Sequence, residues 1–324
     1  MGVIDEIKRP ILTDLQLFAA TFSEALNTDN QLLLSVNEYT HQKSGKQLRP
    51  ILTILSAKIC GEVNRNTILG AQSLELLHTA SLIHDDVIDD TLERRGNPSV
   101  NAQWTNKIAV FSGDYLFSKS LSCATQTNNI AIMKVVSTIG HQLTDGELLQ
   151  LVNSKLSKTS EENYYTIIRK KTAQLFSSCT EVGGLSTNAT EIQLESLRRY
   201  GEYLGMSFQI KDDIFDYYDS IQIGKPTGND LRDGKVTLPL IYALQHSSTS
   251  EKKKITSLID NKDFSTDNIL TIMQFARENG GIDYSIKVME AFKDKAIEEL
   301  RHFPDSDAKK SLVLCAEYAA SREI

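Results

Sequence analysis

The stretch "SLIHDDVIDD" at residues 81–90 places four aspartates, Asp85, Asp86, Asp89 and Asp90, directly after an apolar run. On a helix, residues four apart are neighbours at about 5–6 Å, so Asp85 would face Asp89. At an effective dielectric constant near 20, each like-charged pair costs roughly 3 kcal/mol. A helix C-terminus already carries partial negative charge. The stretch therefore predicts a helix end that binds hard divalent cations. A solvated acidic helix end is the plain alternative.

The acidic pattern occurs twice. Residues 210–216 read "IKDDIFD" and repeat the order of "IHDDVID" at residues 83–89, with Asp212, Asp213 and Asp216 in the corresponding places. Two such matches in one chain are unlikely to arise by accident. Helix bundles often build metal sites from carboxylates on facing helices. The repeat predicts one shared cavity in which metal ions lie between opposing carboxylates.

Composition favours an ordinary globular protein. The chain has 324 residues, with 40% hydrophobic and 24% charged residues, which is enough to bury a large core. The net charge is −7, and no basic tract suggests a nucleic-acid partner. The four cysteines are far apart and form no CxxC pair, which favours reduced core thiols in the cytoplasm. Acidic residues in "MGVIDEIKRPIL" argue against a secretory signal, and we expect no membrane span.

Hydrophobic periodicity predicts helices almost everywhere, and convincing strand alternation is absent. "TSEE" from Thr159 and "TEIQ" from Thr190 resemble capping boxes, so helices should begin near residues 160 and 191. Chain breaks are expected at "RRGNPS" (94–99), "SKTS" (157–160), "GKPTGNDLRDGK" (224–235), "HSSTS" (246–250) and "FPDSD" (303–307). We predict one all-α domain over residues 1–324, a bundle of about ten or more helices around a central cavity.

Basic residues in several segments suggest what the cavity binds. Each alone reads as a surface charge, but around two acidic metal sites they make better sense as clamps for diphosphate oxygens. The basic residues that surround the acidic stretches are Lys46, Arg49, His78, Arg94, Arg95, Lys170, Lys171, Lys225 and Lys235.

An ordered set of motifs resembles the trans-isoprenyl diphosphate synthase (polyprenyl synthetase) family. "GKxxR", "LxHDDxxDD…RRG", "GDYLF", "KTAxLF", "FQxxDDxxD" and "GKPxGNDLRxGKxTLP" occur in family order, from about residue 40 to "GKVTLPL". A single DDxxD would be weak, whereas the ordered set is specific. The resemblance implies an all-α fold, usually a homodimer, and Mg²⁺-dependent elongation of an allylic diphosphate by isopentenyl diphosphate.

The resemblance also implies roles for individual residues. Carboxylates that would hold Mg²⁺ on the allylic diphosphate are Asp85, Asp86 and Asp89 in the first motif and Asp212, Asp213 and Asp216 in the second. Basic residues that would contact that diphosphate are Arg94, Lys171 and Lys235, with Lys225 supporting the second motif. Residues that would receive isopentenyl diphosphate are Lys46, Arg49, His78 and Arg95. Thr172 and Gln209 would line the reacting allylic carbon with oxygen dipoles.

Product length is expected to depend on residues just before the first motif. Ala80 and Ser81 are small, whereas short-chain relatives have bulky aromatics there, so the sequence resembles a long-chain synthase of the kind that supplies quinone side chains. Leu77 and Leu74 lie deeper on the same expected face. Close helix packing is the plain reading of Ala80 and Ser81. A long tail would be released at a membrane surface or to an apolar carrier.

Three alternatives remain open at this point. A farnesyl or geranylgeranyl diphosphate synthase would make a shorter product. A terpene cyclase shares the fold, but its second motif normally mixes Asn, Ser and Glu. A non-catalytic partner subunit would tend to lose metal aspartates, whereas both sets are intact. The metal role of Gln150 is also open, because some short-chain relatives have an acid at its place in "DGELLQ".

Overall fold

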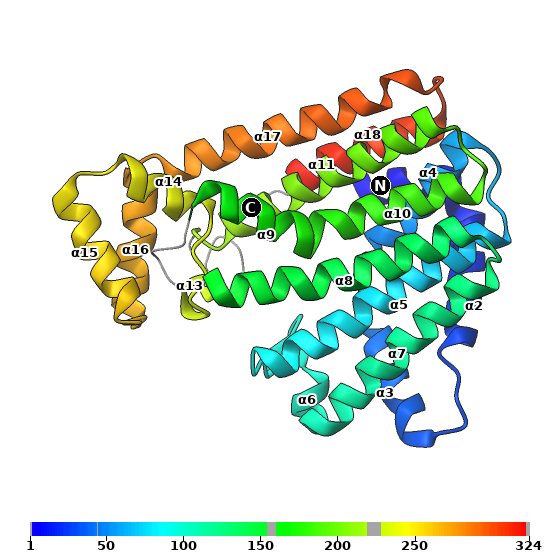
Figure 1. Cartoon of the computed structure of the whole chain (residues 1–324), viewed down its shortest axis with the longest axis horizontal. Coiled ribbons are helices and arrows are strands. Elements are labelled where there is room, and N and C mark those ends of the chain that lie inside the picture. The colour runs from blue at the N-terminus through cyan, green and yellow to red at the C-terminus, as the bar shows by residue number, and fades with distance from the viewer. Residues whose placement is uncertain (1, 44, 154–159, 219–227, 322–324) are drawn as a thin grey trace. The chain divides into compact units, whose positions relative to one another are not determined.

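The computed structural model describes residues 2–43, 45–153, 160–218 and 228–321, and these are mostly helical (Figure 1). The predicted all-α class is confirmed. Elements up to residue 153 are α1 (Val3–Lys8), η1 (Arg9–Ile11), α2 (Leu12–Ala25), α3 (Gln31–Gln42), α4 (Leu48–Cys60), α5 (Arg65–Ile88), β1 (Glu93–Arg94), β2 (Asn97–Pro98), α6 (Val100–Gln103), α7 (Asn106–Gln126) and α8 (Ile130–Asn153). Elements from residue 161 on are α9 (Glu161–Ile168), η3 (Arg169–Ala173), α10 (Gln174–Ser186), α11 (Glu191–Phe215), α13 (Asn229–Arg232), α14 (Leu238–His246), α15 (Thr249–Asp260), α16 (Thr266–Glu278), α17 (Gly281–Glu299), η4 (Leu300–His302) and α18 (Asp307–Ala320).

The chain divides into two compact units. Unit 1 comprises residues 1–141, 176–201 and 299–314, and unit 2 comprises residues 142–175, 202–298 and 315–324. The first acidic stretch therefore belongs to unit 1 and the second to unit 2. Within the described parts of both units, no helix is long and apolar enough to cross a membrane.

Helix α5 carries the first acidic stretch and begins at a capping box. The Asn64 side chain accepts hydrogen bonds from the N–H groups of Asn66 and Thr67, and the Thr67 hydroxyl accepts one from the Asn64 N–H. The helix packs against α4 and α7, and most of its residues from Thr67 to Leu77 are buried. It continues to Ile88, so the predicted acidic helix end is confirmed.

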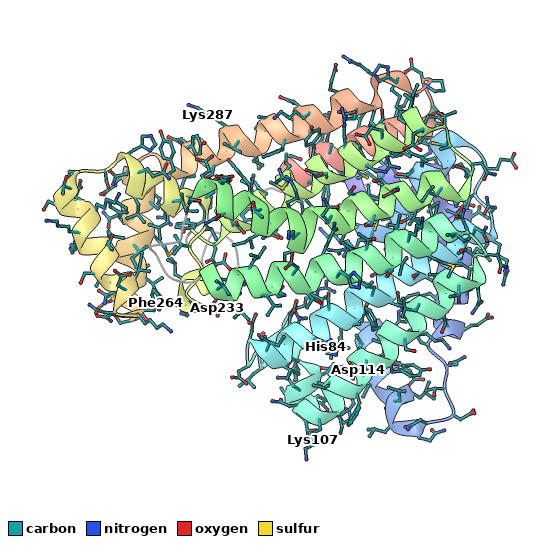
Figure 2. All side chains as sticks on the ribbon, in the orientation of Figure 1. His84, Lys107, Asp114, Asp233, Phe264 and Lys287 are labelled. Carbon is teal, nitrogen blue, oxygen red and sulfur yellow. The ribbon has the colours of Figure 1, made fainter. Side chains whose placement is uncertain are left out.

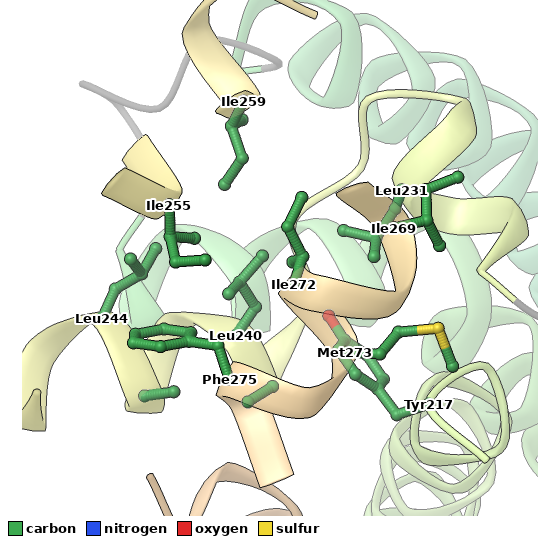
Figure 3. Packing of buried hydrophobic residues seen from close by; sticks show 12 residues of the cluster. Tyr217, Leu231, Leu240, Leu244, Ile255, Ile259, Ile269, Ile272, Met273 and Phe275 are labelled. Atoms are coloured by element: carbon green, nitrogen blue, oxygen red, sulfur yellow. The ribbon is translucent and has the colours of Figure 1, made fainter. Parts of the chain in front are cut away.

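One hydrophobic core cluster of unit 2 lies between α14, α15 and α16. Figure 3 shows Leu240 and Leu244 of α14 facing Ile255 of α15 and Ile272 and Phe275 of α16. Each of these side chains is at most 7% exposed, so together they bury a continuous apolar surface. Tyr217, next to the second acidic stretch, and Leu231 of α13 belong to the same cluster.

Predicted helix starts agree with the structure, and one break proved to be a hairpin. Gln193 and Thr190 form the predicted capping box, with the Thr190 N–H donating to Gln193 Oε1 at 2.9 Å. Ser160 caps α9, while Thr159 lies outside the described residues. Residues 93–98 form two paired strands, and Arg95 and Gly96 turn between them with φ values of 55° and 73°. Strands of two residues have no readable periodicity, so the sequence predicted only a break.

Candidate active site

The first acidic stretch closes helix α5. Asp85 and Asp86 lie in its last turn, and Asp89 caps it, with its N–H donating to the Asp85 carbonyl at 2.8 Å. Asp86 is buried, Asp85 is half-buried and Asp89 is exposed. The three carboxylates at this helix end therefore differ in how far they are exposed to solvent.

Arg94 of the hairpin neutralises Asp86. Its Nε lies 2.9 Å from both carboxylate oxygens of Asp86, and its Nη2 lies 2.6 Å from Oδ1. Such forked geometry is among the strong hydrogen-bonding arrangements in proteins. The sequence placed both residues near the allylic diphosphate but did not predict their pairing, because the pairing depends on how the hairpin folds back.

His84 ties the acidic end of α5 to α7. Its Nε2 lies 3.3 Å from Asp114 Oδ1 and 3.2 Å from the Val110 carbonyl oxygen (Figure 2). Gly113 lies beneath the imidazole, and a Cβ there would approach Nε2 to 2.3 Å. Gly113 and Asp114 belong to the "GDYLF" motif, so the motif shapes the support of the helix end.

A cationic cluster surrounds His78 in unit 1. Burial lowers the pKa of His78 well below its ordinary value, and the nearby charges of Arg49, Arg95 and Arg94 lower it further. The charged form of the imidazole is thus disfavoured beside the guanidinium groups. Arg49 lies over the Phe176 ring, with its Cζ 5.1 Å from the ring centroid, which fixes its plane. Several guanidinium charges around this histidine suit a polyanionic ligand.

Glu75 balances part of this charge. Burial raises the pKa of its carboxyl group, while Arg49 and Arg95 lower it. Arg95 also donates from Nη1 to the Lys43 carbonyl at 3.1 Å, and its Cζ would lie 3.0 Å from a Cβ on Gly45. Gly45, the glycine of the "GKxxR" motif, therefore lies against Arg95 of the hairpin turn, while Lys46 of the same motif is exposed.

In unit 2, a chain of hydrogen bonds joins the "KT" motif to the second acidic stretch. The Thr172 hydroxyl donates to Gln209 Oε1 at 2.6 Å, and Gln209 Nε2 donates to Asp213 Oδ1 at 2.8 Å. The Tyr164 hydroxyl donates to Asp213 Oδ2 at 2.6 Å. Burial raises the pKa of Asp213 well above its ordinary value, and the charge of Asp230 raises it further.

Lys171 and Thr172 lie on the π-helical turn η3 between α9 and α10. π-turns inside helices often mark functional sites, because they redirect side chains. Lys171 Nζ lies 2.6 Å from Glu147 Oε1, and Lys170 pairs with Asp145, both on α8. The structure thus gives Lys171 a carboxylate partner that the sequence did not predict.

Asp216 binds the backbone that follows the second motif. Its carboxylate oxygens accept from the N–H groups of Asn229 at 3.0 Å and Asp230 at 2.9 Å. Burial raises the pKa of Asp230 to about 7, with Asp216 adding to the rise and Lys235 opposing it. Lys235 Nζ lies 2.9 Å from Asp233 Oδ2. Lys225 lies outside the described residues.

The donor chemistry fits a hard divalent cation. Both acidic stretches offer carboxylate oxygens, which Mg²⁺ prefers. Among the residues with defined positions, no three His, Cys, Asp or Glu side chains gather closely enough to enclose a metal ion. Mg²⁺ usually binds through one or two carboxylates and completes its shell with water and substrate phosphates. The residues therefore fit a cation that binds together with a diphosphate.

The residues expected to control product length lie on α5, in the turns that precede the first acidic stretch. Ala80 and Leu77 are 1% and 2% exposed, and Leu74 is fully buried. Ser81 is half-buried and its hydroxyl donates to the His78 carbonyl at 2.9 Å. Their role in chain length stays a prediction.

Comparison with known proteins identifies the family. The profile described as Polyprenyl synthetase matches residues 30–275. This chain belongs to the polyprenyl synthetase family. Octaprenyl diphosphate synthase of Haemophilus influenzae is 34% identical over 322 residues, which is 98% of this chain and 97% of the relative.

Solved structures agree with this polyprenyl synthetase assignment. A polyprenyl synthase from Caulobacter crescentus CB15, complexed with calcium and isoprenyl diphosphate, matches with a TM-score of 0.93 and 30% identity, over 99% of this chain and 98% of that one. A geranylgeranyl pyrophosphate synthase from Bacteroides thetaiotaomicron matches with a TM-score of 0.86 and 41% identity, over 99% of this chain and 100% of that one. The protein is therefore a prenyltransferase enzyme.

In this polyprenyl synthetase, the predicted residues form two groups. Arg49, His78, Arg94 and Arg95 gather in unit 1, and Thr172, Gln209 and Asp213 are joined in unit 2. The shared cavity between the two acidic stretches stays a prediction. Sequence reasoning assigned no role to the residues that contact these groups, which are Glu75, Glu147, Tyr164 and Asp230. Of these, Asp230 and Glu147 stood inside quoted stretches, "GKPTGNDLRDGK" and "DGELLQ", so these two had a signal in the sequence.

Proposed function

We propose that the protein is a Mg²⁺-dependent trans-prenyltransferase that condenses isopentenyl diphosphate with an allylic diphosphate, such as farnesyl diphosphate. The product would be a long-chain all-trans polyprenyl diphosphate, of the kind that supplies quinone side chains. One catalytic domain would span the whole chain.

The observation that carries this proposal is the cationic cluster around His78. Arg49 and Arg95 place their charges near His78 and lower its pKa, and an aspartate motif ends the helix that carries His78. A site with guanidinium charges and few carboxylates suits a diphosphate that binds without metal. An acidic motif suits a diphosphate that binds with metal. A guanidinium cluster and an acidic motif at neighbouring parts of unit 1 match a reaction with two diphosphate substrates.

The proposed chemistry assigns a role to each of these groups. Ionisation of the allylic C–O bond leaves positive charge on carbon and negative charge on the departing diphosphate. A bound Mg²⁺ would supply Lewis-acid stabilisation of that negative charge. Lys171 and Lys235 add fixed positive charge, and the oxygens of Thr172 and Gln209 face the allylic carbon. Lys46, Arg49, His78 and Arg95 hold isopentenyl diphosphate so that its double bond attacks C1, which removes translational freedom from the step.

Proton loss from the new C–C adduct completes the turnover. The released diphosphate is the base that the resemblance to the family implies. No protein nucleophile takes part. Asp85, Asp86, Asp89, Asp212, Asp213 and Asp216 would provide the metal ligands, with Lys225 supporting the second motif.

The small side chains of Ala80 and Ser81 support a long product, as does the similarity to an octaprenyl diphosphate synthase. The similarity to a geranylgeranyl pyrophosphate synthase supports a shorter product as the alternative. We propose a homodimer, because α7 exposes Val110, Phe111, Phe117 and Leu121. A cytoplasmic location is also part of the proposal. A long prenyl tail is insoluble in water, so release at a membrane surface is part of the proposal.

One incubation separates these readings. Purified protein is mixed with Mg²⁺, farnesyl diphosphate and labelled isopentenyl diphosphate, and dephosphorylated products are separated by reversed-phase chromatography. A ladder of long polyprenols supports the proposal, and a stop at geranylgeraniol supports the short-chain alternative. No incorporation by the protein alone would point to a partner subunit, and a cyclised hydrocarbon would point to a terpene cyclase.

A further inference from the structure

Tyr164 is a buried tyrosine whose hydroxyl group has one acid partner. It lies on α9 and is 5% exposed, and Asp213 on α11 is 4% exposed. Its hydroxyl donates to Asp213 Oδ2 at 2.6 Å, within the range of O–H···O hydrogen bonds. The motif-based assignment of roles does not include this residue.

Asp213 is held from both sides by protein donors. Tyr164 occupies Oδ2, and Gln209 Nε2 donates to Oδ1 at 2.8 Å. The side-chain amide of a glutamine can flip by 180° at little cost in free energy, unless its hydrogen-bond partners distinguish its oxygen from its nitrogen. Both oxygens of Asp213 act as acceptors in this arrangement, so the NH₂ group of Gln209 faces the Asp213 side chain.

This orientation fixes what Thr172 does. With the amide nitrogen bound to Asp213, Gln209 Oε1 faces the Thr172 hydroxyl and accepts its proton at 2.6 Å. The single hydroxyl proton of Thr172 is then committed. Its oxygen lone pairs, together with the second lone pair of Gln209 Oε1, remain available for positive charge.

We propose that Tyr164 is a positioning residue for ionisation of the allylic diphosphate. Through Asp213 it locks the Gln209 amide, so that Thr172 and Gln209 present oxygen lone pairs to the allylic carbon as positive charge develops. The inference rests on the proposed function, and it gives Asp213, one of the proposed metal ligands, a second role as the acceptor that joins Tyr164 to Gln209. Preorganised dipoles of this kind act mainly on the transition state.

Tyr165 offers a matched control. It follows Tyr164 on the same helix, but its hydroxyl donates to Glu161 Oε1 at 2.6 Å, and Tyr284 donates to the same oxygen at 2.5 Å. Neither Glu161 nor Tyr284 belongs to the chain that ends at Thr172. Tyr165→Phe therefore removes an identical hydroxyl group without touching the Gln209 amide.

The test compares Tyr164→Phe and Tyr165→Phe in full-length protein with Mg²⁺. Tyr164→Phe should lower kcat by about 10- to 100-fold, the size expected for misplaced reacting groups. The KM for each substrate, and the Kd of an unreactive thiolo-diphosphate analogue measured by calorimetry, should stay within about threefold, because binding precedes ionisation. Tyr165→Phe should keep kcat within about twofold.

A second variant covers the case in which Tyr164→Phe folds poorly. Gln209→Glu keeps the shape but cannot donate to Asp213, so it breaks the same chain without opening the core. Its loss of kcat should not add to that of Tyr164→Phe in the double variant. Additive losses, or a Tyr164→Phe enzyme with wild-type kcat, overturn the inference. Weaker analogue binding in proportion to the lost kcat also overturns it, because that result indicates a binding role.

Failure of the inference is distinguishable from failure of the proposed function. A wild-type protein that elongates farnesyl diphosphate alongside a fully active Tyr164→Phe variant removes the inference alone. A wild-type protein that incorporates no isopentenyl diphosphate removes both.

Discussion

Asp230 is a residue of unit 2 whose surroundings disfavour the ionised carboxylate. Burial raises its pKa to about 7, the charge of Asp216 raises it, and Lys235 lowers it. A folded protein tolerates such a group when its charge is needed, and strongly perturbed carboxylates cluster at functional sites for that reason. Asp230 therefore connects the stability of unit 2 to the proposed cation site.

We expect Asp230→Asn to stabilise the metal-free protein at alkaline pH. An unfolded Asp titrates near about 3.9, so between that pH and about 7 the folded state binds the extra proton, and stability falls as pH rises through this window. The variant lacks this loss. Its melting temperature in EDTA should exceed that of the wild type at pH 8, and the difference should shrink towards pH 4.

The control for this measurement is Asp307→Asn. Asp307 is 81% exposed on α18, so its replacement should leave the melting temperature nearly unchanged at both pH values. Equal melting of Asp230→Asn and wild type at pH 8 would show that Asp230 is not destabilised by burial.

Residue types were predictable from sequence, whereas several of their partners were not. The aspartates and Arg94 stand in motifs, and the structure places them at a helix end and on a hairpin. Two contacts could not be predicted from residue spacing: the bidentate pair between Arg94 and Asp86, and the hydrogen bond that the Tyr164 hydroxyl donates to Asp213. Both depend on how the backbone of one element runs relative to the other. Side-chain partners across elements are set by packing, which acts on the folded chain as a whole.

Helix α10 approaches α4 closely at Gly183. A Cβ at this position would lie 2.3 Å from the Thr53 carbonyl oxygen and 2.8 Å from Ser56 Cβ. Backbone atoms of a packed helix cannot move aside individually, so the strain of an added methyl group spreads through both helices. The glycine is therefore required by the distance between the elements.

Gly183→Ala should destabilise the protein by about 1–3 kcal/mol, the usual cost of overpacking. Gly140→Ala on α8 is the matched control, because its Cβ would lie 3.4 Å from the Phe117 ring, which can give way. The control should be neutral or slightly stabilising, since alanine is favoured in helices by up to about 1 kcal/mol. Urea denaturation measures both changes. Equal stabilities of the two variants would contradict the contact argument.

Helix α5 also carries the predicted determinant of product length. Ala80 is 1% exposed and lies in the helix that presents the first acidic stretch. A phenyl ring there would project into whatever space the growing tail uses, so Ala80→Phe should shorten the product ladder by steric closure. Reversed-phase chromatography of the polyprenols measures this, and an unchanged ladder would refute it. The melting temperature of the variant is the control, because overpacking by about 1–3 kcal/mol must not unfold the enzyme.

Element existence was predictable, but two local irregularities were not. Thr190 signals the start of α11 through a local capping pattern. The hairpin at residues 93–98 and the π-turn at Arg169–Ala173 leave no comparable signal, because two-residue strands have no period and a π-turn keeps the composition of a helix. Both irregularities orient predicted site residues, Arg94 and Arg95 in the first and Lys171 and Thr172 in the second. Local consistency commonly fails at functional sites.

At the scale of the whole molecule, α7 combines one aspartate that contacts α5 with several exposed apolar side chains. Asp114 faces His84 of α5, while Phe111 is 73% exposed and Val110, Phe117 and Leu121 are 39–40% exposed. Exposed apolar side chains that recur on one helix indicate an interaction surface. In a two-fold symmetric dimer the same surface of each subunit meets its copy, so a single helix can supply both sides.

Phe111→Glu should convert the proposed homodimer to a monomer. The new carboxylate would meet its symmetry-related copy within an apolar interface, where desolvated like charges cost several kcal/mol. Light scattering after size exclusion should then give the mass of one 36.2 kDa chain in place of two. Ile192→Glu is the matched control, because Ile192 on α11 is 75% exposed without neighbouring exposed apolar residues on its own helix among those described. A dimer that persists in Phe111→Glu, or a wild type that is already monomeric, would remove α7 as the interface. Loss of dimers in both variants would instead indicate a general effect of added negative charge.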